Sequence, residues 1–178
     1  MLLMTPAADP FEDVLGANRR YSRTFDLTGL PPVAARGLAI ITCMDSRIEP
    51  LDMLGLKPGD AKIMRNAGAR VTTDVLRTLV LATNLLGVNR VMVVPHTDCK
   101  MASAGREEVE ALIAEHSGVD TRSLDFHLIA DQRATLERDV QAIRSWPFLP
   151  EGIPVGGYLY DVDAGLLETV VSPLPPGH

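Results

Sequence analysis

The chain has 178 residues, which is enough for one compact domain with a substantial hydrophobic core. Apolar residues make up 46% of it and charged residues 22%, as in ordinary globular proteins, while aromatic residues are only 4%, so aliphatic side chains must fill the core. The net charge of −6 argues against nucleic acid or an anionic membrane as the main partner.

The first residues, Met1 to Met4, form an apolar segment far shorter than the core of a signal peptide. No run of about 18 apolar residues occurs that could span a membrane. We therefore expect a cytoplasmic protein without a membrane partner. Thiols stay reduced in the cytoplasm, so Cys43 and Cys99 are expected to be ligands, nucleophiles or core residues before they are a disulfide.

The first third of the chain predicts a helix followed by two strands. Residues 1–10 contain two prolines and are expected to form a loose arm, and apolar spacing predicts a helix at 11–25. The continuous apolar run at 37–43 is typical of a strand buried on both faces. A short helix at 50–54 then leads to a second strand at 61–65.

The middle of the chain predicts a buried helix and two more strands. The helix at 75–86 is apolar nearly all round, so it should be buried on more than one side, partly in the core and partly at an interface. A third strand is predicted at 88–95, a helix at 106–116 and a fourth strand at 126–130, where His127 would be a core or interface residue.

The last part predicts a helix at 132–146 and then a β-hairpin, with strands at 157–162 and 166–171 around a turn at 163–165. Strands that alternate with helices predict an α/β fold with a mostly parallel central β-sheet flanked by helices and a C-terminal antiparallel hairpin at the edge. We find no repeat or linker in the sequence, so we expect one domain over 1–178.

Polar residues follow three of the predicted strands. Cys43 ends the first strand, Arg65 and Asn66 end the second, and His96 ends the third. Ligands of open parallel sheets gather outside the carboxyl ends of the strands. We therefore expect these residues to meet at one edge of the sheet.

A zinc site is predicted at this edge. His96 and Cys99 lie three residues apart, so both side chains can face one point, and Cys43 can supply a third ligand. One imidazole and two thiolates suit zinc in tetrahedral geometry. Three protein ligands leave one position open, which is typical of a catalytic zinc whose bound water ionises near neutral pH.

Two residues beside Cys43 are candidates for catalysis. Asp45 could accept a hydrogen bond from the zinc-bound water, or it could itself be the fourth ligand. Arg47 would pair with Asp45 and keep it ionised, although such a pair could also be purely structural. The spacing from Cys43 to Arg47 is too short for a phosphatase-type phosphate loop.

The motifs CMDSR, RNAGA and HTDC together resemble those of the β-class carbonic anhydrases, in particular the compact bacterial members. The C-x-D-x-R and H-x-x-C elements of that family match Cys43, Asp45, Arg47, His96 and Cys99. The resemblance implies a zinc lyase that hydrates CO2 reversibly to bicarbonate by attack of a zinc-bound hydroxide. It also implies a homodimer or dimer of dimers with active sites at the subunit interface, and an Asp45 that alternates between Arg47 and the zinc.

The same motifs leave alternatives open. Lys100 stands where the family usually has glycine, and related proteins on this scaffold hydrolyse carbon disulfide or carbonyl sulfide. A third possibility is a non-catalytic zinc domain with Asp45 as permanent fourth ligand. The substrate pocket is assigned to four residues, of which the last three could instead form only a tight turn: Ser46, Asn66, Ala67 and Gly68.

Overall fold

The computed structural model describes residues 9–173 and divides the chain into two compact units, Met1–Pro31 and Pro32–His178. Most of the predicted loose arm at 1–10 lies outside the described residues, and one domain over the whole chain stays a prediction. The first unit contains helix α1, Glu12–Tyr21, which ends earlier than predicted. Beyond it, the hydroxyl groups of Ser22 and Thr24 donate to main-chain carbonyls of the last turn, at 3.0 and 3.2 Å.

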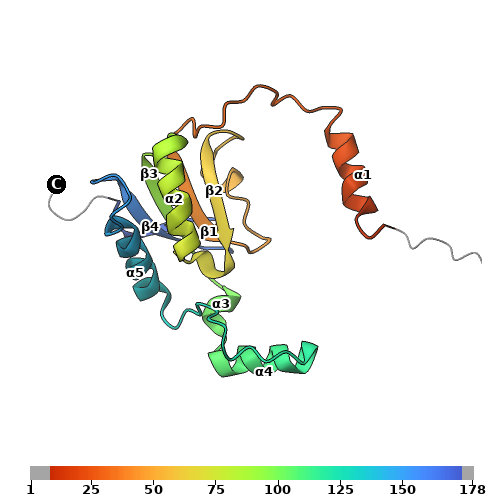
Figure 1. Cartoon of the computed structure of the whole chain (residues 1–178), viewed down its shortest axis with the longest axis vertical. Coiled ribbons are helices and arrows are strands. Elements are labelled where there is room, and N and C mark those ends of the chain that lie inside the picture. The colour runs from red at the N-terminus through yellow and green to blue at the C-terminus, as the bar shows by residue number, and fades with distance from the viewer. Residues whose placement is uncertain (1–8, 174–178) are drawn as a thin grey trace, which may run out of the picture. The chain divides into compact units, whose positions relative to one another are not determined.

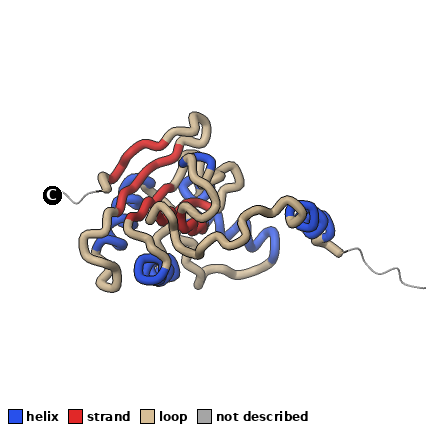
Figure 2. The backbone as a smooth tube through the Cα atoms, turned by 90° about the horizontal axis from the view of Figure 1, so that it is seen from above, coloured by secondary structure: helices blue, strands red, loops and turns tan. Residues whose placement is uncertain are grey.

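The second unit is built on one five-stranded sheet (Figures 1 and 2). Its strands are β1 Leu38–Cys43, β2 Ala61–Asn66, β3 Arg90–Val94, β4 Val155–Tyr160 and β5 Leu167–Val171. In the order β2-β1-β3-β4-β5, the first four strands are parallel and β5 is antiparallel to β4 at the edge. This confirms the predicted α/β fold with its C-terminal edge hairpin.

The helical segments of this unit are η1 Asp52–Leu54, η2 Ala67–Ala69, α2 Thr73–Leu85, α3 Lys100–Ser103, α4 Arg106–Ser117 and α5 Gln132–Arg144. Helices α2 and α5 cover one face of the sheet (Figure 1). Side chains of residues 51–56, around η1, pack against the other face. None of the helices in the described part of the chain is long and apolar enough to cross a bilayer.

Strand β1 lies between β2 and β3 and is buried along its whole length, as its apolar run predicts. Its side chains alternate between two cores, because successive strand residues point to opposite faces. Ile41 packs in the core under α2 and α5, whereas Ile40 packs on the opposite face, and both are completely buried.

Helix α2 begins and ends as its sequence indicates. The Thr72 hydroxyl accepts from the Val75 amide at 3.5 Å, and Gly87 has a positive φ of 72° just beyond the last turn. Only one side of the helix is buried in this chain, since Leu81 and Leu85 are 44% and 68% exposed.

The predicted strand at 126–130 is wrong, because this segment is an irregular connection between α4 and α5. The sheet position beside β3 is taken by β4, so the segment has no strand position there. His127 has a φ of 52°, which is incompatible with a strand, and its side chain is 47% exposed and pairs with Asp125 at 3.1 Å. It is therefore not a core residue of this chain, and the alternative that it lies at an interface stays a prediction.

Candidate metal centre

The register of the parallel strands brings the predicted residues to one edge of the sheet. Cys43 pairs with Asn66 across β1 and β2, and Thr42 pairs with Val94 across β1 and β3. His96 follows two residues after Val94. The carboxyl ends of three neighbouring strands therefore carry the polar residues, as expected for an open α/β sheet.

Cys43, His96 and Cys99 form the centre of this edge. Their ligand atoms all lie within 4.8 Å of one another, and the two sulfur atoms are 4.0 Å apart. All three residues are almost completely buried, at 4%, 0% and 4% exposure. Within residues 9–173 this is the only group of three or more His, Cys, Asp or Glu side chains placed to hold a metal ion.

Hydrogen bonds around the cluster hold Cys43 and His96 in place. The Gly68 amide donates to Cys43 Sγ at 3.3 Å. His96 Nδ1 lies 2.7 Å from the Thr97 carbonyl oxygen, a contact that assigns the proton to Nδ1 and leaves a lone pair on Nε2. The Gln132 side chain on α5 donates to the His96 carbonyl at 2.6 Å.

These side chains fit a soft divalent cation. His96 Nε2 is buried and has no hydrogen-bond partner among the described residues, which is costly unless another group binds it. A hydrogen bond from the Cys99 thiol stabilises the Cys43 thiolate and lowers the pKa of Cys43. The same bond raises the pKa of Cys99, because ionisation of Cys99 would break it and place two neighbouring thiolates that repel each other. A cation would remove that repulsion, so two thiolates and an imidazole favour zinc.

Asp45 lies beside the cluster and is bound to Arg47. The guanidinium donates to both carboxylate oxygens, at 3.0 Å from Nε and 2.8 Å from Nη2, and the Arg47 amide donates at 2.9 Å. These hydrogen bonds hold the pKa of Asp45 well below its usual range. Oδ2 of the same carboxylate lies 3.8 Å from His96 Nε2, so Asp45 contacts both Arg47 and the cluster.

The four predicted substrate residues play different parts in the structure. Ser46 is exposed, Ala67 is half-buried and Gly68 is buried behind Cys43. The Asn66 amide group is engaged in the turn that follows β2, since it donates to the Arg70 carbonyl and accepts from the Arg70 amide, both at 2.7 Å. Contact of these residues with a substrate stays a prediction.

Two residues of the site have roles that the sequence did not predict: Arg65, which was expected at this edge without a role, and Asp98, which was not singled out. Arg65 donates to the main-chain carbonyls of Cys43 and Asp45, at 2.9 and 2.6 Å, and so orients the segment that carries both side chains. Asp98 accepts from Arg47 Nη1 at 2.8 Å. Asp98 lies inside the HTDC motif, so its position between two predicted ligands could have drawn attention to it.

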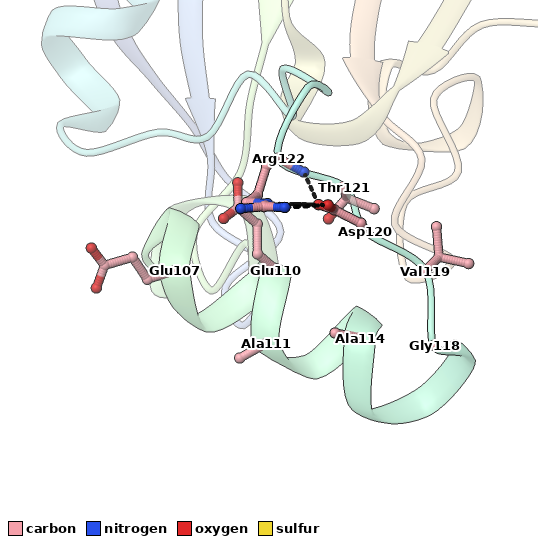
Figure 3. Close-up of a pocket in the computed structure, with 9 residues that line it drawn as sticks. All are labelled: Glu107, Glu110, Ala111, Ala114, Gly118, Val119, Asp120, Thr121 and Arg122. Atoms are coloured by element: carbon pink, nitrogen blue, oxygen red, sulfur yellow. Dashed lines mark hydrogen bonds and ion pairs between the residues drawn. The ribbon is translucent and has the colours of Figure 1, made fainter.

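A separate cavity of about 430 Å³ lies between α4 and the loop that follows it (Figure 3). Carboxylates line this cavity, and two of them form ion pairs with arginines. Glu110 pairs with Arg106 at 2.8 Å and Asp120 pairs with Arg122 at 2.6 Å. This cavity contains none of the residues predicted to be functional.

The carbonic anhydrase family model matches residues 38–167. Beta-carbonic anhydrase 1 of Mycobacterium tuberculosis is 33% identical over 162 residues, which cover 89% of this chain and 96% of that protein. The carbon disulfide hydrolase of an Acidianus species is 32% identical over 156 residues, covering 75% and 76%. Among solved structures, a carbonic anhydrase from Streptococcus mutans matches with a TM-score of 0.84 and 35% identity, over 96% of this chain and 99% of that one.

Proposed function

The chain belongs to the β-carbonic anhydrase family, and from this premise we propose that it catalyses the reversible hydration of CO2 to bicarbonate and a proton. The observation that carries the proposal is the buried cluster of two thiols and an imidazole next to an arginine-bound carboxylate. The function of the cluster is to hold zinc through Cys43, His96 and Cys99. Zinc bound there supplies a Lewis acid that lowers the pKa of water to near neutrality.

Asp45 and Arg47 are the catalytic side chains in this proposal. Because Arg47 keeps Asp45 ionised, the carboxylate is a hydrogen-bond acceptor at neutral pH and can orient a water molecule next to the cluster. Asp45 Oδ2 is near enough to His96 for this, at 3.8 Å from Nε2. Ser46, Ala67 and Gly68 would form the wall of the substrate pocket, and Asn66 would keep the turn behind it in shape.

The relatives also support a second candidate reaction. A 32% identical relative is named a carbon disulfide hydrolase, so hydrolysis of carbon disulfide or carbonyl sulfide at the same cluster is the alternative. A non-catalytic zinc domain with Asp45 as permanent ligand is less well supported, because both oxygens of Asp45 are already bound by Arg47.

We further propose that the protein acts in the cytoplasm as a homodimer or a dimer of dimers. Leu81 and Leu85, on the exposed side of α2, offer apolar surface for such an assembly.

Stopped-flow measurement of CO2 hydration tests the proposed reaction. The zinc-loaded protein should show a rate at alkaline pH that is lost when zinc is removed. The Asp45→Ala variant should keep its zinc and lose at least about tenfold in kcat, because the water is no longer oriented. Asp120→Ala is a matched control, since Asp120 pairs in the same i,i+2 manner with Arg122 away from the cluster.

The outcomes separate the three candidates. Release of sulfide from carbon disulfide, without CO2 hydration, would favour the hydrolase. Stoichiometric zinc without any zinc-dependent rate on either substrate would favour the structural zinc domain.

A further inference from the structure

Arg47 is held by two aspartates on different segments of the chain. Asp45 accepts from Nε and Nη2, while the Asp98 carboxylate accepts from Nη1 at 2.8 Å. The main-chain carbonyl of Asp98 accepts a further hydrogen bond from Nη2, at 3.2 Å. The guanidinium plane is therefore fixed from two sides, which a single bidentate pair would not achieve.

The backbone at Asp98 is unusual and explains how both of its groups reach Arg47. Its φ is 53°, in the left-handed region that non-glycine residues rarely adopt and that aspartate and asparagine tolerate best. Asp98 stands between His96 and Cys99, so the turn that aims these two side chains at one point also carries the anchor for Arg47.

We propose that Asp98 is a positioning residue, which fixes Arg47 and through it the direction of the Asp45 carboxylate beside the metal cluster. The catalytic consequence of this inference rests on the proposed function. The contact between Asp98 and Arg47 is independent of that function. Asp45 Oδ2 lies only 3.8 Å from His96 Nε2, so a modest rotation of Asp45 changes its relation to the cluster. Anchoring Arg47 from its other side restricts that rotation.

The effect is mainly geometric. The Asp98 side chain is 75% exposed and that of Arg47 is 46% exposed, so solvent screens the attraction between their charges. Loss of the Asp98 carboxylate should leave the fold intact and change the order of the Arg47 side chain.

Two substitutions separate the side chain from the turn. Asn and Gly both tolerate the left-handed conformation, so Asp98→Asn and Asp98→Gly preserve the turn and the main-chain carbonyl. The first removes the charge and the second removes the whole side chain. Asp120→Asn is the control for loss of an exposed carboxylate that pairs with an arginine, because Asp120 pairs with Arg122 at the separate cavity, away from Arg47 (Figure 3).

The direct readout is hydrogen exchange of the Arg47 Nε–H, measured by NMR on the protein as purified and assigned with Arg47→Lys. This proton is donated to Asp45, so its protection reports the Asp45–Arg47 bond and not the Asp98 contact itself. Exchange should be several-fold faster in both Asp98 variants and unchanged in Asp120→Asn. In the zinc-loaded enzyme, kcat for CO2 hydration should fall about three- to tenfold with KM and zinc content unchanged.

Unchanged Arg47 exchange in both Asp98 variants would overturn the inference, whether or not the protein hydrates CO2. Faster exchange with unchanged kcat, or a fall in kcat that merely follows loss of zinc, would also overturn it. A wild-type protein without CO2 hydration would refute the proposed function, and the exchange measurement would still decide whether Asp98 holds Arg47 on Asp45.

Discussion

Gly68, which lies next to the cluster, is a residue whose identity is tightly restricted by its surroundings. Its φ is 83°, and its amide donates to Cys43 Sγ at 3.3 Å. A Cβ atom at this position would lie 3.0 Å from Ile129 Cδ1 and 3.4 Å from Met101 Cβ. The small residues of RNAGA therefore bring a main-chain N–H to the Cys43 sulfur, which is a role besides the turn and the pocket wall considered from the sequence.

We expect Gly68→Ala to lower the free energy of unfolding by about 2 kcal/mol, from backbone strain together with crowding against Ile129. Urea unfolding measures this loss. Gly118→Ala is the control, because Gly118 has a similar φ of 71° with nothing within 4 Å of the added Cβ, so it should lose only about 1 kcal/mol. Equal losses in the two variants would show that the packing around Gly68 is not tight.

At the scale of elements, one ion pair joins α5 to the turn after β2. Arg70 Nε donates to Asp139 at 2.8 Å, and the two side chains are only 18% and 8% exposed. Arg70 also donates to the His127 carbonyl at 2.7 Å. The same arginine thus connects the turn behind the cluster, helix α5 and the irregular segment that we had predicted to be a strand.

Asp139→Ala should destabilise the protein by about 2–4 kcal/mol, because it leaves the Arg70 charge mostly buried without its carboxylate. Chemical unfolding followed by circular dichroism gives this value. Asp74→Ala serves for comparison, since the Asp74–Arg77 pair is 77% and 63% exposed and its loss should cost less than about 0.5 kcal/mol. The idea fails if both variants are equally stable.

At the scale of the whole molecule, the sequence predicts the sheet well because its central strands are short continuous apolar runs. The run that became β1 is buried at every residue, and the carboxyl-end rule correctly brings Cys43 and His96 together from strands that are far apart in the chain. The segment at 126–130 is apolar too, but only Ile129 in it is buried, and the Ile129 amide donates to the Met101 carbonyl at 2.9 Å instead of joining a strand of the sheet.

The roles within the site that were not predicted depend on contacts between segments. Arg65 acts through main-chain carbonyls of Cys43 and Asp45, and such bonds leave no motif in the sequence. The role of Asp98 depends on its positive φ and on Arg47, which lies 51 residues earlier in the chain. This role can be recognised only when the positions of both segments in the fold are known. The residues with the chemistry and the nearby Arg47 were thus predictable from local motifs, whereas the orienting roles of Arg65 and Asp98 were not.

The proposed assembly of several chains can be tested through the exposed side of helix α2. Leu85 is 68% exposed, although the sequence of helix α2 is apolar on nearly all sides. We expect a second copy of the chain to cover this side of the helix. Leu85→Glu should then shift the mass in solution toward the 19.3 kDa of one chain, as measured by sedimentation velocity or light scattering. Leu166→Glu is a matched control, equally exposed at 68% but in the β4–β5 turn, and should leave the assembly unchanged.

A Leu85→Glu protein that stays dimeric or larger would place the interface elsewhere, and a monomeric wild type would refute the proposed assembly.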